Sequence, residues 1–203
     1  MDEIILFGAG GHAVACVDVI ELSGKFTVAG FIEKSETNIQ STLGYPVLGT
    51  DDDLQSLRGK YSHALIAVGQ IQSVAIRVRL FQALQQMDYM LPVIVSPKAY
   101  VSKHAQIGAG TIVMHGAIIN ANARVGTNCI INNRALVDHD AEIGDHSHIA
   151  TGAIINGEVS VGHASFIGSG VVTKQCLSIG SNCIVGAGVV LKNDMAPNQV
   201  IKN

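Results

Sequence analysis

A dense polar cluster between residues 138 and 148 offers side chains for acid–base chemistry. The stretch reads DHDAEIGDHSH, with three histidines and four acidic residues. Imidazole is suited to moving a proton at neutral pH, because its pKa lies near ~6.5. Three roles compete for this cluster: a solvated edge, a zinc site made of His139, His146 and His148, and a general base at His139.

A second chemical signal lies near the start of the chain, which reads ILFGAGGHA over residues 5–13. Gly8, Gly10 and Ala13 match the dinucleotide-binding fingerprint in its G-x-G-x-x-A form. Together with Gly11, these glycines would let backbone amides approach a phosphate at a helix start. Glu33 closes the next predicted strand, where an acidic side chain would hold a ribose hydroxyl or a base edge. The motif predicts a diphosphate site, with a tight turn that binds nothing as its alternative.

Composition limits the classes of protein that the chain can belong to. The net charge of −3 gives no support for a nucleic-acid partner. No apolar run approaches the ~18 to 20 residues that span a bilayer, and no leader precedes the first predicted strand, so we expect a cytoplasmic protein. The four cysteines form no spaced framework, which favours reduced thiols.

The elements that must position these residues follow two different periods. Residues 1–94 alternate strand-like and helix-like segments, which predicts a small Rossmann-like parallel sheet of the α/β class. The predicted strands cover residues 4–7, 28–32, 64–68 and 92–95, and the predicted helices cover residues 12–22, 52–57 and 71–87.

From residue 95 onward the hydrophobic period is six. Every sixth residue from Val95 to Leu191 is Val, Ile or Leu, except for Thr173, which is β-branched as well. Neither a helix nor an alternating strand has this period, but a β-solenoid does, because each short strand sends one aliphatic side chain into a narrow core. A narrow core also explains why aromatic residues make up only 4% of the chain and Trp is absent.

The repeat carries a family resemblance. The tandem pattern [LIV]-G-x-x-[STAV]-x, as in IGAGTI, IGDHSH, VGHASF, IGSNCI and VGAGVV, resembles the hexapeptide-repeat acyltransferases. Those proteins fold as left-handed parallel β-helices with three hexads per triangular coil, and they assemble as homotrimers. With FGAGGHA near the N-terminus, the chain is similar to the sugar-nucleotide acetyltransferases related to the bacillosamine-pathway N-acetyltransferase and the sialic-acid O-acetyltransferases. The resemblance implies a nucleotide-sugar-binding domain over residues 1–94 and a left-handed β-helix over residues 95–203.

A coil of three hexads turns the sequence into a map of neighbours. Residues i and i+18 lie one above the other, ~4.8 Å apart, so that Gly157 stacks on His139. His139 and His148 stand half a coil apart, on the order of 15 Å at ~3.3 Å per residue, so one chain cannot gather a zinc site from them. We therefore expect no metal. A backbone amide beside Gly157 could act as an oxyanion donor next to a base at His139.

The resemblance also implies individual roles. VDHDAEIGD matches the family's catalytic motif, which implies that His139 is the general base and that Asp138 orients it. By position, Asn132 would lie near the sugar, His148 would contact acetyl-CoA, and the Gly157 amide would meet the acetyl carbonyl.

Further positions are implied for the two substrates. The pantetheine arm of acetyl-CoA would touch backbone near Ser169 and Ala187, and Lys174 and Lys192 are candidate phosphate partners. His12 would lie near the diphosphate of the nucleotide sugar. No inserted loop interrupts the repeat between residues 95 and 191, so the chemistry must come from coil faces, which fits active sites between subunits of a homotrimer.

We expect an acetyl-CoA-dependent N-acetyltransferase of glycan biosynthesis that acts on a nucleotide-linked amino sugar, in the first place a UDP-4-amino-4,6-dideoxy-N-acetyl-hexosamine. A sialic-acid-type O-acetyltransferase and a GDP-linked amino-sugar N-acetyltransferase are close alternatives. An NAD-binding oxidoreductase is a more distant one, but about four predicted strands are too few for two mononucleotide-binding halves. A non-catalytic β-helical scaffold would not need His139 in register with Gly157.

Overall fold

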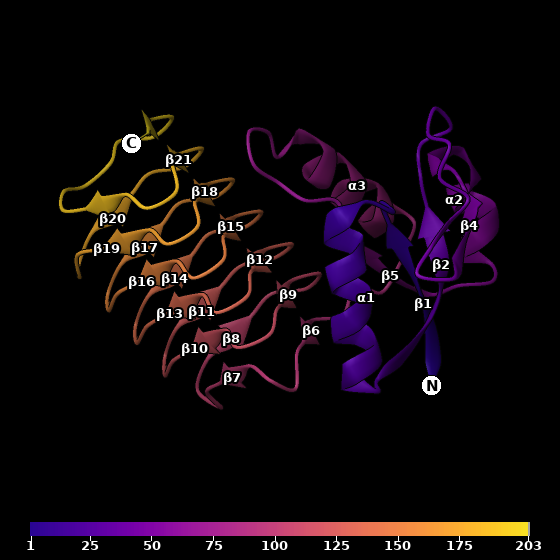
Figure 1. The fold of residues 1–203 in the computed structure, drawn as a ribbon, viewed down its shortest axis with the longest axis horizontal. Helices are drawn as coiled ribbons and strands as arrows, with labels where there is room; N and C mark the ends of the chain where they lie inside the picture. The colour runs from indigo at the N-terminus through magenta and orange to yellow at the C-terminus, as the bar shows by residue number, and fades with distance from the viewer. Residues whose placement is uncertain (203) are drawn as a thin grey trace.

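The computed structural model describes residues 1–202 and consists of an α/β part followed by a long β-helix (Figure 1). Asn203, the last residue of the expected second domain, lies outside the described residues. No helix within residues 1–202 has both the length and the apolar character that crossing a membrane requires.

The α/β part is built on a five-stranded sheet of order β3-β4-β2-β1-β5. Its strands are β1 (Asp2–Phe7), β2 (Phe26–Ile32), β3 (Ser41–Thr42), β4 (Tyr45–Gly49) and β5 (His63–Ile66). The strands β2, β1 and β5 pair in parallel, β4 adds to β2 in parallel, and β3 pairs with β4 in antiparallel orientation. The inner strands are apolar along their length because both faces of the sheet are covered, and Ile4 to Phe7 are all buried.

Its helical elements are α1 (Gly11–Ser23), the 3₁₀ turn η1 (Asp51–Asp53), α2 (Leu54–Arg58) and α3 (Ala75–Gln86). The predicted helix over residues 71–87 is therefore too long. Residues 71–74 belong to a loop, and the Ser73 hydroxyl accepts a hydrogen bond from the Ala75 amide where the helix begins. The α1 helix ends at Gly24, whose φ of 62° is left-handed.

Two other sequence expectations need correction. The strand predicted at residues 92–95 is β6 (Ile94–Val95), which pairs with the β-helix and not with the N-terminal sheet. The strands β3 and β4 were not predicted, because Pro46 breaks the strand signal of their short hairpin.

From β6 onward, two-residue strands stack in three parallel sheets that form the sides of a prism (Figure 1). The first sheet, called the covered face, holds β6, β9 (Ile112–Val113), β12 (Ile130–Ile131), β15 (His148–Ile149), β18 (Phe166–Ile167), β21 (Ile184–Val185) and β23 (Val200–Ile201). The second sheet, called the apolar face, holds β7 (Tyr100–Val101), β10 (Ile118–Ile119), β13 (Leu136–Val137), β16 (Ile154–Ile155), β19 (Val172–Thr173) and β22 (Val190–Leu191). The third sheet, called the polar face, holds β8 (Gln106–Ile107), β11 (Arg124–Val125), β14 (Glu142–Ile143), β17 (Ser160–Val161) and β20 (Ser178–Ile179).

The register confirms three hexads per coil, as expected for the left-handed β-helix. Ile118 pairs with Leu136, which in turn pairs with Ile154, so each partner lies one coil further along the chain. The second residue of each strand points into one continuous aliphatic core. From Gly110 to Gly188 the chain turns each corner through a residue in the left-handed region, for example Asp140 with a φ of 59°.

The two parts of the chain share a core. Side chains of α1 pack in one cluster with Ile94, Ile112, Met114 and Ile130 of the first coils, and α1 lies alongside those coils in Figure 1. All four cysteines are free, and three of them are buried.

Candidate active site

His139 lies at the corner between the apolar face and the polar face, and its side chain is 56% exposed. Its Nδ1 lies 2.9 Å from Oδ2 of Asp140. Because a carboxylate only accepts hydrogen bonds, Nδ1 carries the proton, and Nε2 is left with a free lone pair. The hydrogen bond to Asp140 raises the pKa of His139 above its ordinary value, and the charge of Asp138 raises it further.

The structure places a different carboxylate on this imidazole from the one the sequence suggested. Oδ1 of Asp138 accepts hydrogen bonds from Nδ2 of Asn120 at 2.7 Å and from the backbone amide of His139 at 2.8 Å. Asp138 therefore fixes the backbone of the turn, while Asp140 contacts the ring. The DHD sequence alone does not tell which of the two aspartates contacts the imidazole, because both are neighbours of His139 in the chain.

Gly157 lies directly over the His139 ring, as the coil map predicts. A Cβ atom at Gly157 would lie only 2.7 Å from both Cε1 and Nε2 of His139. Within residues 1–202 nothing accepts a hydrogen bond from the Gly157 amide, so this donor is available beside the imidazole. The two residues border a cavity of about 320 Å³, which is lined by Asp138, His139, Asn156, Gly157, Glu158, Gln175 and Cys176.

Asn132 and His148 form a second polar group at the opposite edge of the apolar face. Nδ2 of Asn132 lies 3.1 Å from Nε2 of His148, and Nδ1 of His148 lies 2.7 Å from the carbonyl oxygen of Gln70. His148 is only 7% exposed, and burial lowers its pKa to about 4. The imidazole is therefore neutral at physiological pH. Sequence reasoning missed Gln70, because a contact across 78 residues leaves no local pattern.

The residues expected along the pantetheine arm follow the same edge as Asn132. Ser169 and Ala187 are exposed and lie one coil apart along that edge. The backbone carbonyl oxygen of Ser169 accepts a hydrogen bond from the Gly188 amide of the next coil at 2.8 Å. Lys174 and Lys192 are exposed on the His139 edge, one and two coils beyond Asn156. Within one chain, the His139 group and the Asn132 group thus lie on different corners and do not meet.

The glycine turn of the α/β part is open to a ligand. Gly10 caps α1 and Gly11 is its first residue, and a Cβ atom at either position would meet nothing within 4 Å. Gly8 has a φ of 99°, and its amide donates to Ile32 of the neighbouring strand at 2.8 Å. Gly8 therefore shapes the turn, while Gly10 and Gly11 present exposed backbone at the helix start.

Glu33 braces this turn. Its Oε2 accepts a hydrogen bond from the Ala9 amide at 2.7 Å, and its Oε1 accepts one from the Lys34 amide at 3.0 Å. Both carboxylate oxygens of Glu33 thus bind backbone amides of this chain, a role that the sequence analysis did not expect beside the ribose or base contact.

His12 follows the turn with its Nε2 buried and without a hydrogen-bond partner in residues 1–202. Burial lowers the pKa of His12 to about 3, and the positive charge of Arg77 contributes to the shift. Arg77 itself is fully buried and donates to the carbonyl oxygens of Ile66 and Val68 and to Asn128 of the β-helix. Sequence analysis did not single out Arg77.

A cavity of about 410 Å³ lies beyond the carboxyl ends of β2 and β4, where ligands bind in open α/β sheets. Its lining consists of Lys34, Ser35, Glu36, Thr50, Asp51, Asp52, Ile76 and Arg79. Nη2 of Arg79 pairs with Oδ2 of Asp51 at 2.9 Å. The lining thus presents both signs of charge to a ligand.

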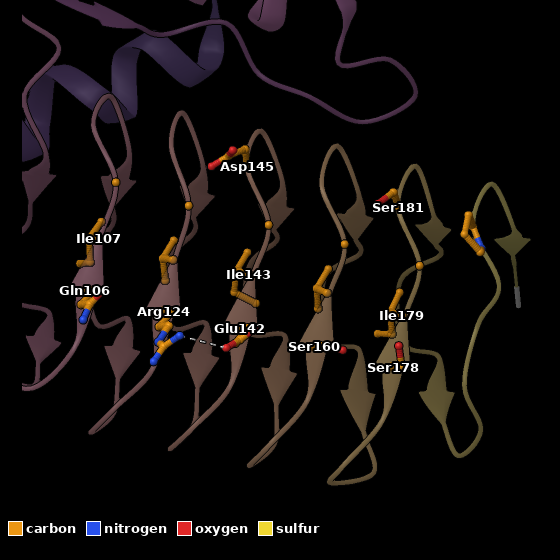
Figure 2. Close-up of a pocket in the computed structure, with 18 residues that line it drawn as sticks. Gln106, Ile107, Arg124, Glu142, Ile143, Asp145, Ser160, Ser178, Ile179 and Ser181 are labelled. Carbon is orange, nitrogen blue, oxygen red and sulfur yellow. Dashed lines mark ion pairs between the residues drawn. The ribbon is translucent and has the colours of Figure 1, made fainter.

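The polar face has a groove of its own, about 750 Å³ in volume (Figure 2). Its outward side chains include Gln106, Ser160 and the ion pair of Arg124 with Glu142 at 3.6 Å. None of the candidate site residues lines this groove. Within residues 1–202, no group of three or more His, Cys, Asp or Glu side chains is arranged to hold a metal ion.

Two protein-family models match the chain, one in the α/β part and one in the β-helix. Residues 3–84 match the model of the PglD N-terminal domain, and residues 158–193 match the model of the hexapeptide repeat of succinyl-transferase. A comparison with curated protein sequences gives no match.

Solved structures resemble the whole chain. The acetyltransferase domain of PglB from Neisseria gonorrhoeae is 29% identical with a TM-score of 0.91, and the similarity covers 100% of this chain and 97% of that one. The same domain in complex with acetyl coenzyme A is 30% identical with a TM-score of 0.90, covering 99% and 96%. PerB from Caulobacter crescentus, in complex with CoA and GDP-perosamine, is 31% identical with a TM-score of 0.93, covering 100% and 95%.

Proposed function

Because this chain belongs to the hexapeptide-repeat acetyltransferases with a PglD-type N-terminal domain, which use acetyl-CoA, we propose that it acetylates the amino group of a nucleoside-diphosphate-linked amino sugar. The observation that carries the proposal is the pairing of His139 with the free Gly157 amide above it. An acetyl-transfer site needs a proton acceptor and an oxyanion donor within reach of one carbonyl carbon, and these two groups supply them.

The proposed reaction uses the free lone pair on Nε2 of His139. The amine of the sugar attacks the thioester carbonyl carbon, and Nε2 takes the amine proton as the N–C bond forms. The carbonyl oxygen becomes an oxyanion that accepts a hydrogen bond from the Gly157 amide. The C–S bond then breaks, and the imidazolium returns its proton to the departing CoA sulfur. Asp140 stabilises the imidazolium formed in between, because its carboxylate contacts Nδ1 at 2.9 Å.

We propose that the complete site forms between subunits of a homotrimer. The apolar face leaves Tyr100, Ile118 and Val190 exposed by 59%, 40% and 59%. These side chains belong to one column on the sheet, which continues through the half-buried Leu136, Ile154 and Val172 on the strands between Ile118 and Val190. An apolar column of this kind favours burial against another copy. The His139 corner and the Asn132 corner flank this face, so pairing two copies would bring one corner of each together.

The nucleotide would occupy the cavity beyond the carboxyl ends of β2 and β4, with the diphosphate at the amides of Gly10 and Gly11. The acceptor expected from the sequence is a UDP-linked 4-amino-4,6-dideoxy sugar. A GDP-linked amino sugar is the second candidate, which the likeness to PerB with bound GDP-perosamine favours. Family membership disfavours the NAD-dependent oxidoreductase and the non-catalytic scaffold.

An acetyl-transfer assay across UDP- and GDP-linked 4-amino sugars, read out as CoA thiol release, tests the proposal. We expect turnover with at least one sugar, and we expect His139→Ala to lower turnover by about 10²- to 10⁴-fold while leaving the fold intact. No transfer to any sugar, or near-normal turnover of His139→Ala, would contradict it.

A further inference from the structure

The Asn132 group contains a hydrogen-bond chain that runs from the α/β part into the β-helix. It begins at the carbonyl oxygen of Gln70, passes through Nδ1 and Nε2 of His148, and ends at Nδ2 of Asn132. The two links measure 2.7 Å and 3.1 Å. This chain joins elements that are separated by more than 60 residues of sequence.

The first link fixes the tautomer of His148. A backbone carbonyl can only accept, so the proton must sit on Nδ1, and Nε2 must carry a lone pair. Burial keeps the ring neutral, since it lowers the pKa of His148 to about 4. His148 therefore has no free N–H with which to donate to an acetyl carbonyl.

The second link fixes the orientation of the Asn132 amide. Oδ1 of Asn132 accepts a hydrogen bond from the Asn133 amide at 2.7 Å, while its Nδ2 donates to His148. Turning the amide over would set an oxygen against the lone pair of Nε2 and an NH₂ group against the Asn133 N–H. Both contacts would then be lost, so only one orientation satisfies the group. That orientation leaves one N–H of Asn132 for a ligand.

The other end of the chain adjoins the nucleotide-binding turn. Gln70 lies in the loop between β5 and α3, and the preceding Gly69 packs beside His12, since a Cβ atom there would lie 3.6 Å from Cβ of His12. Gln70 itself is only 3% exposed, so its contact with His148 is shielded from solvent. The α/β part thus supplies the anchor, and the β-helix supplies the two side chains that the anchor orients.

We propose that His148 is a positioning residue that acts on the acceptor sugar through Asn132 and not a residue that binds acetyl-CoA. The inference rests on the proposed acetyl transfer for its functional meaning. The chain from Gln70 to Asn132 presents one N–H of Asn132 to the sugar in a fixed direction, and misplacing such a group costs turnover with little effect on the other substrate.

A double-mutant cycle tests the role. We expect His148→Ala and Asn132→Ala each to lower kcat/KM for the amino sugar by ~10- to 100-fold, and the double variant to be no worse than Asn132→Ala alone.

The dissociation constant for acetyl-CoA, measured by calorimetry, should change less than about twofold in all three. His148→Gln, whose amide can donate to Gln70 and accept from Asn132, should recover part of the loss. His163→Ala serves as the matched control, since its ring lies on another corner, where Nδ1 is 2.9 Å from the Ser181 hydroxyl.

Independent effects that multiply in the double variant, or a weakened affinity for acetyl-CoA in His148→Ala, would overturn the proposal. Nitrogen-15 NMR of the histidine rings gives a readout that needs no turnover. We expect a neutral His148 protonated on Nδ1, with the Nε2 resonance shifting in Asn132→Ala. A ring protonated on Nε2 refutes the chain itself, even in a protein that acetylates none of the sugars tested, so the two failures are distinguishable.

Discussion

The Asp140 carboxylate governs the charge of His139, since it holds Nδ1 at 2.9 Å and is the first cause of the raised pKa. A general base works only in its neutral form, so activity should rise with pH as His139 loses its proton. The Asp140 carboxylate stabilises the imidazolium, which moves this increase in activity to higher pH, and it also orients the imidazole ring. The raised pKa and the orientation of the ring thus both depend on Asp140, and a pH profile of a variant without this charge reports them separately, as the position of the acidic limb and the maximal rate.

Asp140→Asn should therefore move the acidic limb of the kcat/KM profile to lower pH and reduce the maximal rate. The shift has this sign because the neutral amide no longer favours the protonated imidazole. A pH–rate profile of kcat/KM measures it. Glu142→Gln removes the same charge from the next strand without touching His139, and its profile should coincide with that of the unaltered protein. An unmoved acidic limb in Asp140→Asn would assign the limb to another group.

Gly157→Ala should reduce turnover by on the order of tenfold or more and leave stability nearly unchanged. The added methyl would come within 2.7 Å of the His139 ring, and an exposed ring can move aside at little cost to folding. Parallel measurement of kcat and of the urea midpoint checks this. Gly152→Ala, where a Cβ atom would meet nothing within 4 Å, controls for the loss of a glycine, although its left-handed φ of 66° adds local strain. A large loss of stability in Gly157→Ala would count against the explanation.

At the scale of elements, the hexad period carried most of what the sequence could reveal. With the coil of three hexads that the family resemblance implied, it predicted the stacking of Gly157 on His139 and the separation of His139 from His148 by half a coil. It could not reveal the contact of Gln70 with His148, because the two residues lie 78 positions apart and belong to segments with different periods. Contacts such as that of Arg77 with Asn128 join two periodic segments 51 residues apart, and neither period encodes the pairing.

Arg77 joins the α/β part to the β-helix. Its guanidinium is fully buried and donates to two backbone carbonyls of the β5 region and to both the carbonyl and the side-chain oxygen of Asn128. These partners are neutral, so the fork of donors, and not a carboxylate, makes burial of the charge tolerable.

We expect Arg77→Met to lower the free energy of unfolding by on the order of 3 kcal/mol, because it leaves buried acceptors without donors. Arg77→Lys should recover only part of this, since an ammonium cannot reproduce the fork. Urea-unfolding midpoints provide the measurement. Arg79→Met on the same helix removes an exposed arginine paired with Asp51, and it should cost less than about 1 kcal/mol. If Arg77→Met and Arg79→Met lost the same free energy of unfolding, the buried hydrogen bonds of Arg77 would not contribute more to stability than an exposed ion pair.

For the whole molecule, the division of the site between two corners makes assembly part of the chemistry. The shared core fixes the α/β part on the covered face, so the glycine turn stays with the Asn132 corner of its own chain. The apolar face remains available for another copy, which would contribute its His139 corner. The sequence indicated this division through the half-coil spacing, but only the exposed column of Tyr100, Ile118 and Val190 indicates which side pairs.

Subunit complementation tests this division directly. His139→Ala and Asn132→Ala are each expected to be impaired, by the losses given above, but mixed trimers should be more active than either variant alone, because some sites pair an intact His139 corner with an intact Asn132 corner. With random mixing of equal amounts, about a quarter of the sites qualify in a cyclic assembly. Co-expression of two differently tagged variants, tandem purification and the acetyl-transfer assay measure the recovery. Ile118→Asp, which places a charge on the apolar face, should abolish both the trimer and the recovery in the same preparation. A site confined to one chain predicts no recovery at any mixing ratio, since every subunit then carries a defect in its own site.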